Sequence, residues 1–197
     1  MWVMLDKAGM DALFSGARSH NGFLDWPVPE ALLRELYDLL KWGPTSANCS
    51  PQRILFLASP EAKARLLPAL SPGNVAKTES APVTCILGYD RRFYEHAEAL
   101  FPHNPGLYDS FTRDEGHAET TAFRNATLQA GYFLLAARAL GLDCGPMSGF
   151  DEALVNETFF PDGRCRVNFL CNLGQGDPAR LFGRLPRLAF EQACSVL

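Results

Sequence analysis

The spacing of apolar residues along the chain predicts helices interrupted by short buried strands. Between residues 29 and 42, the leucines fall on one face of a helix. Gly43-Pro44 should end this helix because proline cannot continue the helical hydrogen bonds. The expected helices cover residues 11–17, 29–42, 118–140 and 151–159, with one more beginning at Ser59-Pro60-Glu61, and the expected strands cover 53–57, 82–89 and 167–173.

These elements indicate one domain that spans residues 1–197. Helices mixed with three or four strands are typical of an α+β or α/β fold, and no repeat or linker divides the chain. Residues 91–116 follow no clear period, and they carry several aromatic side chains among polar and turn residues. This segment is either a lid over a substrate or a packed surface excursion.

The expected helix over residues 118–140 is apolar around most of its circumference between Ala130 and Ala137. A helix of this kind is buried on all sides. In a chain of 197 residues, this pattern predicts that the helix packs against a second subunit as well as against its own core.

Composition and charge limit the classes of partner. The chain is 47% hydrophobic and 20% charged, as in ordinary globular proteins, and its net charge of -4 argues against nucleic acid. No apolar run is long enough to span a membrane, and residues 1–10 do not resemble a secretory signal. Six scattered cysteines form no C-x-x-C pair. We therefore expect a cytoplasmic protein with structural thiols and with neither a nucleic-acid nor a membrane partner.

Motifs for nucleophilic, metal and dinucleotide chemistry do not fit the chain. Gly174-Gln-Gly-Asp-Pro178 lacks the third glycine of a dinucleotide loop, and a turn after a strand explains it. Met147-Ser148-Gly149 has Pro146 where a nucleophile elbow requires glycine. The four histidines include no pair at helical metal-ligand spacing. We therefore expect no catalytic side chain that acts as a nucleophile and no metal site.

Several short polar segments remain as candidates for ligand binding. Taken singly, each has a structural explanation, because loop hydroxyls and amides are common in turns and surface arginines are usually solvated. The segments are Arg18-Ser19, Thr45 to Asn48, the pair Asn74 and Lys77 one helical turn apart, Pro146 to Gly149, and Arg184 with Arg187.

Taken in order, these segments resemble those of the nitroreductase family of FMN enzymes. Four positions depart from the family pattern: Ala17 stands where a second arginine often precedes the serine, His20 and Asn21 stand where other members have different residues, and Ser50 replaces glutamine. The resemblance covers nearly the whole chain and includes Arg18-Ser-His-Asn-Gly-Phe23, Trp42-Gly-Pro-Thr-Ser-Ala-Asn-Cys-Ser-Pro51, Asn74-Val-Ala-Lys77, Gly145-Pro-Met-Ser-Gly-Phe150 and the arginines near the C-terminus.

The resemblance implies an α+β fold with a central, mostly antiparallel sheet flanked by helices, in a domain-interlocked homodimer whose flavin lies at the subunit boundary. It also implies that arginines bind the FMN phosphate, that Lys77 stabilises the negative charge of the reduced ring, and that a loop from Pro146 covers the ring. The FMN-binding residues expected on this basis are Arg18, Ser19, Asn21, Pro44, Thr45, Ser46, Asn48, Asn74, Lys77, Pro146, Met147, Ser148, Gly149, Arg184 and Arg187.

The amino-acid sequences of these segments most resemble those of one branch of the family, which includes the malonic semialdehyde reductases. That likeness implies hydride transfer from NADH or NADPH, through flavin N5, to a small substrate such as malonic semialdehyde, giving 3-hydroxypropionate. The alternatives are a broad-range nitroreductase or quinone reductase and a non-catalytic flavin-binding protein. A substrate carboxylate would need a cation, and the candidates are Arg91, Arg92, Arg113 and Arg124.

Overall fold

The computed structural model describes residues 4–197 and builds them around one antiparallel sheet. Its strands are β1 (Gln52–Leu57), β2 (Val83–Asp90), β3 (Asp143–Met147) and β4 (Cys165–Gly174), in the order β1-β2-β4-β3. The register sets Cys85 opposite Cys171 and Cys144 opposite Leu173. The predicted α+β fold with a central antiparallel sheet is confirmed. Residues 1–3, which belong to the expected domain and N-terminal segment, lie outside the described residues.

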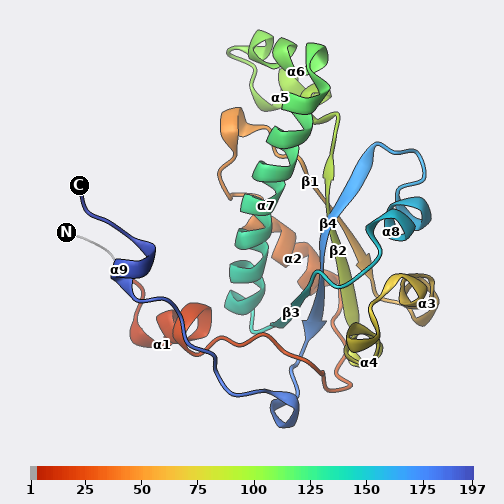
Figure 1. Cartoon of the computed structure of the whole chain (residues 1–197), viewed down its shortest axis with the longest axis vertical. Helices are drawn as coiled ribbons and strands as arrows, with labels where there is room; N and C mark the ends of the chain where they lie inside the picture. The colour runs from red at the N-terminus through yellow and green to blue at the C-terminus, as the bar shows by residue number, and fades with distance from the viewer. Residues whose placement is uncertain (1–3) are drawn as a thin grey trace.

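Helices cover both faces of the sheet (Figure 1). On one face, α2 (Glu30–Leu40) and α7 (Glu115–Ala139) pack Leu36, Leu40 and Phe133 against the buried thiols of the strands. The other face is covered by α3 (Pro60–Leu66), α4 (Pro72–Ser80) and α8 (Glu152–Phe159), over Ile86 and Leu170. The two apolar layers fix α4 and β3, which carry much of the candidate site, relative to the rest of the chain.

Local signals place most element boundaries. Ser59 caps α3 by accepting a hydrogen bond from the amide of Ala62 at 3.1 Å, and Pro60 occupies the first turn. The expected helix 118–140 begins earlier, at Glu115, because the Asp114 side chain accepts from the amide of His117. The expected helix 11–17 is instead α1 (Lys7–Met10) followed by a π-helical turn (Asp11–Ser15).

Strand β3 was not among the expected elements, and the expected loop from Pro146 to Gly149 is therefore wrong in its first half. Pro146 and Met147 end this strand, opposite Cys171 and Leu170 of β4. Proline is tolerated there because β3 is at the edge of the sheet, where one side of the strand needs no amide donor. Of the four residues, only Ser148 and Gly149 lie in the loop, which continues through Phe150 and Asp151 to α8.

Residues 91–113, here called the cap, form short helical turns at the N-terminal end of α7. They comprise Phe93–His96, α5 (Ala97–Leu100), Pro105–Tyr108 and α6 (Asp109–Arg113). The rings of Phe93 and Tyr108 are buried, and the Phe93 and Phe111 ring centroids lie 4.9 Å apart. The cap therefore has an aromatic core of its own.

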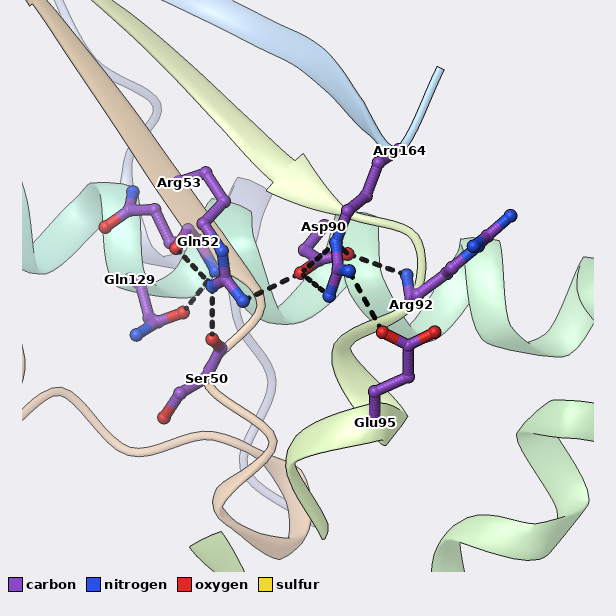
Figure 2. A network of polar contacts seen from close by, with 8 residues as sticks. All are labelled: Ser50, Gln52, Arg53, Asp90, Arg92, Glu95, Gln129 and Arg164. Atoms are coloured by element: carbon purple, nitrogen blue, oxygen red, sulfur yellow. Dashed lines mark hydrogen bonds and ion pairs between the residues drawn. The ribbon is translucent and has the colours of Figure 1, made fainter. Parts of the chain in front are cut away.

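A buried carboxylate ties the cap to the sheet. Asp90, at the end of β2, is 1% exposed and accepts from Arg53 at 2.8 Å and from Arg164 at 3.0 Å. Its other oxygen accepts from the backbone amide of Arg92, and Arg164 also pairs with Glu95 at 3.0 Å. Figure 2 shows the two arginines converging on Asp90 while the Arg92 side chain points away. The cap thus starts from a point that is fixed to β1 through Arg53 and to Arg164, the residue directly before β4.

None of the helices in residues 4–197 combines the length and the apolar character needed to cross a bilayer.

Candidate functional site

The segment from Arg18 to Phe23 runs beside β3 and α4. Ser19 forms a parallel bridge with Cys144, and the amide of His20 donates to the Cys144 carbonyl at 2.9 Å. At the other end of the segment, the amide of Phe23 donates to Ser80 Oγ at the end of α4. These backbone bonds place Arg18, Ser19 and Asn21 along one edge of the sheet.

The C-terminal tail meets this segment through two arginines. Arg18 Nη2 donates to the Phe182 carbonyl at 2.5 Å. Arg184 Nη2 donates to the carbonyls of Ser15 and Ala17 at 2.7 and 3.0 Å. Arg18, Ser19 and Arg184 are therefore neighbours although they are far apart in the sequence. The side chain of Arg187 donates only to backbone carbonyls of the tail itself.

A cavity of about 370 Å³ opens beside Arg18 and is also lined by His20, Arg138 and Asp143. Within it, His20 Nε2 lies 3.2 Å from Asp143 Oδ1, and the second Asp143 oxygen accepts from the amide of Gly176. His20 Nδ1 and Arg138 Nε are buried without a hydrogen-bond partner in the described chain. None of these three residues was expected in the site: Arg138 and Asp143 are far from His20 in the sequence, and only the fold brings them together.

A second cluster lies at the start of α4. Asn74 Nδ2 donates to the Gly149 carbonyl at 2.7 Å, and the amide of Ser71 donates to the same oxygen at 3.0 Å. A Cβ on Gly149 would lie 2.8 Å from Asn74 Nδ2 and 3.2 Å from Ser71 Oγ. Such contacts are too close, so any other residue at this position would force the Asn74 side chain to move.

Lys77 follows one helical turn after Asn74 and is half-buried. Burial lowers its pKa, and no carboxylate in the described chain raises it again or forms an ion pair with it. A partly desolvated ammonium without a counter-charge favours an anionic or electron-rich ligand.

Strand β3 joins the two clusters. Cys144, which pairs with Ser19, and Met147, which precedes Ser148-Gly149, are about 10 Å apart at ~3.3 Å per residue. The phosphate candidates near Arg18 therefore lie beside the start of β3, and the polar groups near Gly149 lie just beyond its end. This arrangement suits an elongated ligand that carries an anionic group at one end.

The loop from Pro44 to Ser50 does not join these clusters within one chain. The amide of Ser46 donates to Asn125 Oδ1 of α7, and Asn48 Nδ2 donates to the Leu100 carbonyl of the cap. The Tyr108 hydroxyl donates to the Ala47 carbonyl at 2.7 Å. In Figure 1, this loop, which links α2 to β1, lies toward the α5–α6 end of α7, whereas α1 and α4 lie at the opposite end. Pro44, Thr45, Ser46 and Asn48 are thus separated from the other expected FMN-binding residues.

The same loop has an unusual backbone. Ala47, Asn48 and Ser50 have φ values of 48°, 54° and 39°, in the left-handed region that side chains other than glycine rarely adopt. Thr45 Oγ1 accepts from the amide of Ser50 and helps to hold the loop in this form. Residues in such conformations persist where the surrounding structure determines them, and they are concentrated at binding sites.

No group of three histidine, cysteine, aspartate or glutamate side chains in residues 4–197 is arranged to hold a metal ion.

Solved structures share this fold. A Bacillus subtilis protein with the provisional name nitroreductase YdfN superposes with a TM-score of 0.85 at 23% identity, covering 98% of this chain and 100% of that one. A nitroreductase from Exiguobacterium sibiricum, also provisionally named and solved in complex with FMN, gives a TM-score of 0.87 at 18% identity, covering 100% and 99%. At these identities, the likeness shows the fold.

Sequence relatives are much closer. HadB of Ralstonia pickettii, provisionally named an NADH dehydrogenase/NAD(P)H nitroreductase, is 58% identical over 98% of this chain and 100% of its own. A protein of Cupriavidus pinatubonensis with the same provisional name is 58% identical over 95% of this chain and 96% of its own. A profile of the Nitroreductase family matches residues 15–174. The chain therefore belongs to the nitroreductase family.

Proposed function

We propose that this protein is an FMN-dependent oxidoreductase that uses NADH or NADPH to reduce a small acceptor. The observation that supports this proposal most strongly is the half-buried Lys77 ammonium, which lies one turn from the Asn74–Gly149 contact and has no counter-charge among residues 4–197. FMN would supply reversible hydride transfer at N5, and the protein would supply binding, orientation and electrostatics. The names of the 58%-identical relatives, which describe NAD(P)H-dependent reductases, support this assignment.

The residues around α4 suit the ring edge of the flavin. Lys77 provides a positive charge that stabilises the reduced, anionic ring more than the oxidised ring, which raises the driving force for its reduction. Asn74 is a neutral donor beside it, although its amide also binds the Gly149 carbonyl. The loop residues Ser148 and Gly149 follow Met147 and offer backbone amides to the same edge. No protein nucleophile is required.

The residues around Arg18 suit the phosphate. Arg18 and Arg184 present guanidinium groups on adjoining segments, and Ser19 is exposed beside them. Guanidinium groups bind phosphate through paired, charge-assisted hydrogen bonds. Arg187 and Asn21 complete the proposed set. Arg18 and Arg184 currently donate to carbonyls at the junction of the N-terminal segment and the tail, so phosphate binding would replace or share these bonds.

The distant Pro44–Asn48 loop favours a homodimer, with one domain per chain over residues 1–197. In the family resemblance, both chains build each flavin site, so Pro44, Thr45, Ser46 and Asn48 would act from the partner subunit. The outer side of α7 supports this, because Phe123, Leu128 and Tyr132 are 40–48% exposed. The tail after residue 181 also exposes apolar side chains, and β1 borders an apolar groove of about 660 Å³. Exchange of the tails would interlock the two domains.

For the acceptor, we propose malonic semialdehyde, with a nitroaromatic compound or quinone as the second candidate. A hydride added to the aldehyde carbon, together with one proton on the oxygen, gives 3-hydroxypropionate. Of the four arginine candidates for its carboxylate, Arg91 is the least suitable because it is already paired with Glu115 and Glu119. Arg92 and Arg113 line a polar cavity of about 480 Å³ beside the cap, and Arg124 is exposed on α7.

Steady-state oxidation of NADH and NADPH by the purified protein, with each acceptor in turn, tests the proposal. We expect turnover of malonic semialdehyde well above that of free FMN. Faster turnover of nitroaromatics or quinones, without turnover of the aldehyde, would favour the second candidate. A flavin-bound protein that oxidises neither nucleotide with any acceptor would be the non-catalytic flavin-binding alternative. Sedimentation of the same preparation tests the homodimer.

A further inference from the structure

The side chain of Asn172 lies directly behind the two segments that border the proposed flavin edge. Asn172 is in β4 and is completely buried. Its Oδ1 accepts from Thr84 Oγ1 of β2 at 2.7 Å, which leaves the amide nitrogen to face α4 and β3. That nitrogen donates to Thr78 Oγ1 at 3.3 Å and lies 3.8 Å from the Met147 sulfur.

This network connects α4 and β3 behind the site. Thr78 follows Lys77 directly on α4, and its hydroxyl also lies 3.8 Å from the Met147 sulfur. Met147 is the last residue of β3 and leads into Ser148-Gly149. On the side of the site itself, Asn74 in the first turn of α4 donates to the carbonyl of Gly149, in the loop that follows β3. Polar contacts therefore link α4 to the end of β3 on one side and to the loop after β3 on the other.

An apolar residue would be the ordinary occupant of this position in the core. A buried amide is destabilising unless its donors and acceptor are paired, and a fully paired network in a low-dielectric interior restricts its members to one arrangement. Asn172 meets this condition through Thr84 and Thr78. Burying the Asn172 amide therefore costs desolvation free energy. A role in orienting α4, which carries both Asn74 and Lys77, would explain why an amide occupies this position.

We propose that Asn172 is a positioning residue for the flavin: through Thr78 and Met147 it sets α4 and the end of β3 so that Lys77 and Gly149 meet the ring edge. The inference rests on the proposed function, since it concerns the same flavin site. Asn172 itself does not touch the ligand; its effect on affinity and potential is transmitted through α4.

The test compares FMN dissociation constants, from titration of the apoprotein, and midpoint potentials of bound FMN in four proteins. These are the wild type, Asn172→Leu, Thr78→Val and the control Asn168→Ala. Asn168 is in the same strand and donates to Thr127 Oγ1 of α7 at 2.7 Å, so the control removes a comparable hydrogen bond elsewhere. Circular dichroism and urea unfolding establish that each variant is folded.

We expect Asn172→Leu and Thr78→Val to weaken FMN binding about tenfold, as residues that support metal ligands do. Both should shift the midpoint potential to more negative values, because Lys77 loses its alignment with the ring. The control should change unfolding only. Folded variants with wild-type affinity and potential would overturn the inference. If Asn172→Leu does not fold, Thr78→Val, which has nearly the same shape as the native side chain, decides alone. A wild-type protein that binds no FMN would instead refute the proposed function.

Discussion

Replacing the buried Asp90 with asparagine should destabilise the protein far more than the removal of an exposed charge. The carboxylate is 1% exposed and is shared by Arg53 and Arg164. Breaking a fully buried ion pair costs roughly 3–5 kcal/mol. Here the arginine side chains are 33% and 35% exposed and can regain water, so we expect a loss of about 2–3 kcal/mol. At about 2–4 °C per kcal/mol for a chain of this length, the midpoint of thermal unfolding should fall by roughly 4–12 °C.

The matched control is Glu95→Gln, which removes the exposed partner of the same Arg164 guanidinium. Exposed pairs contribute only about 0–1 kcal/mol, so this variant should unfold close to the wild type. Thermal and urea unfolding at one protein concentration and with saturating FMN measure both variants, because ligand and subunit binding shift the transition. Equal destabilisation by Asp90→Asn and Glu95→Gln would refute the reasoning that the buried carboxylate anchors the cap.

Four further predictions follow from single contacts. Tyr108→Phe leaves a loop carbonyl without its donor and should lower the free energy of unfolding by about 1–3 kcal/mol in urea denaturation; an unchanged value would contradict this. Lys77→Met should shift the potential of bound FMN to more negative values in a dye-equilibration assay, and a constant potential would remove Lys77 from the site. Gly149→Ala places a Cβ 2.8 Å from Asn74 Nδ2, so FMN affinity should fall in fluorescence titration, whereas wild-type affinity would show that the loop relaxes freely. Burial raises the pKa of Cys49 from 9.0 to about 11. The stabilisation that the neutral, buried thiol contributes is therefore fully present below pH 9 and is lost as the pH rises toward 11. Cys49→Ala should reduce this alkaline loss, and identical pH profiles would contradict it.

The sequence predicted those parts of the fold in which a local signal coincides with burial. The leucine period fixed α2, and Ser59-Pro60 marked the start of α3. Strand β3 escaped prediction because Gly145-Pro146 is read as a turn, and only the edge position in the sheet makes proline acceptable there. The start of α7 was placed too late because its capping residue, Asp114, lies within the stretch of residues 91–116 that has no apolar period.

The candidate site was predictable only as a set of segments in family order. The family resemblance placed Arg18, Asn74, Gly149 and Arg184 in the expected set. The fold brings Arg18 close to Arg184 and Asn74 close to Gly149. Contacts such as His20 with Asp143 could not be foreseen, because residues so far apart in sequence leave no local pattern. The same holds for Asn172, which the sequence shows only as one polar residue within an apolar strand.

The position of the Pro44–Asn48 loop supports the proposed homodimer independently of the apolar surface of α7. Within one chain, this loop is held by Asn125 and by the cap, away from α4. Its left-handed residues are fixed by contacts with Tyr108 and Leu100, so the cap shapes the loop. If the loop completes the partner's flavin site, then the cap contributes to that site indirectly, and a loss of dimerisation should also weaken FMN binding.

The central claim, a flavin site served by a nicotinamide reductant, is tested most directly by the absorbance of the purified protein under anaerobic conditions. We predict the two bands of oxidised flavin, retained after gel filtration, and their rapid loss when NADH or NADPH is added in stopped flow. A protein that is colourless even after incubation with FMN, or whose flavin bands persist in the presence of both nucleotides, would contradict the account.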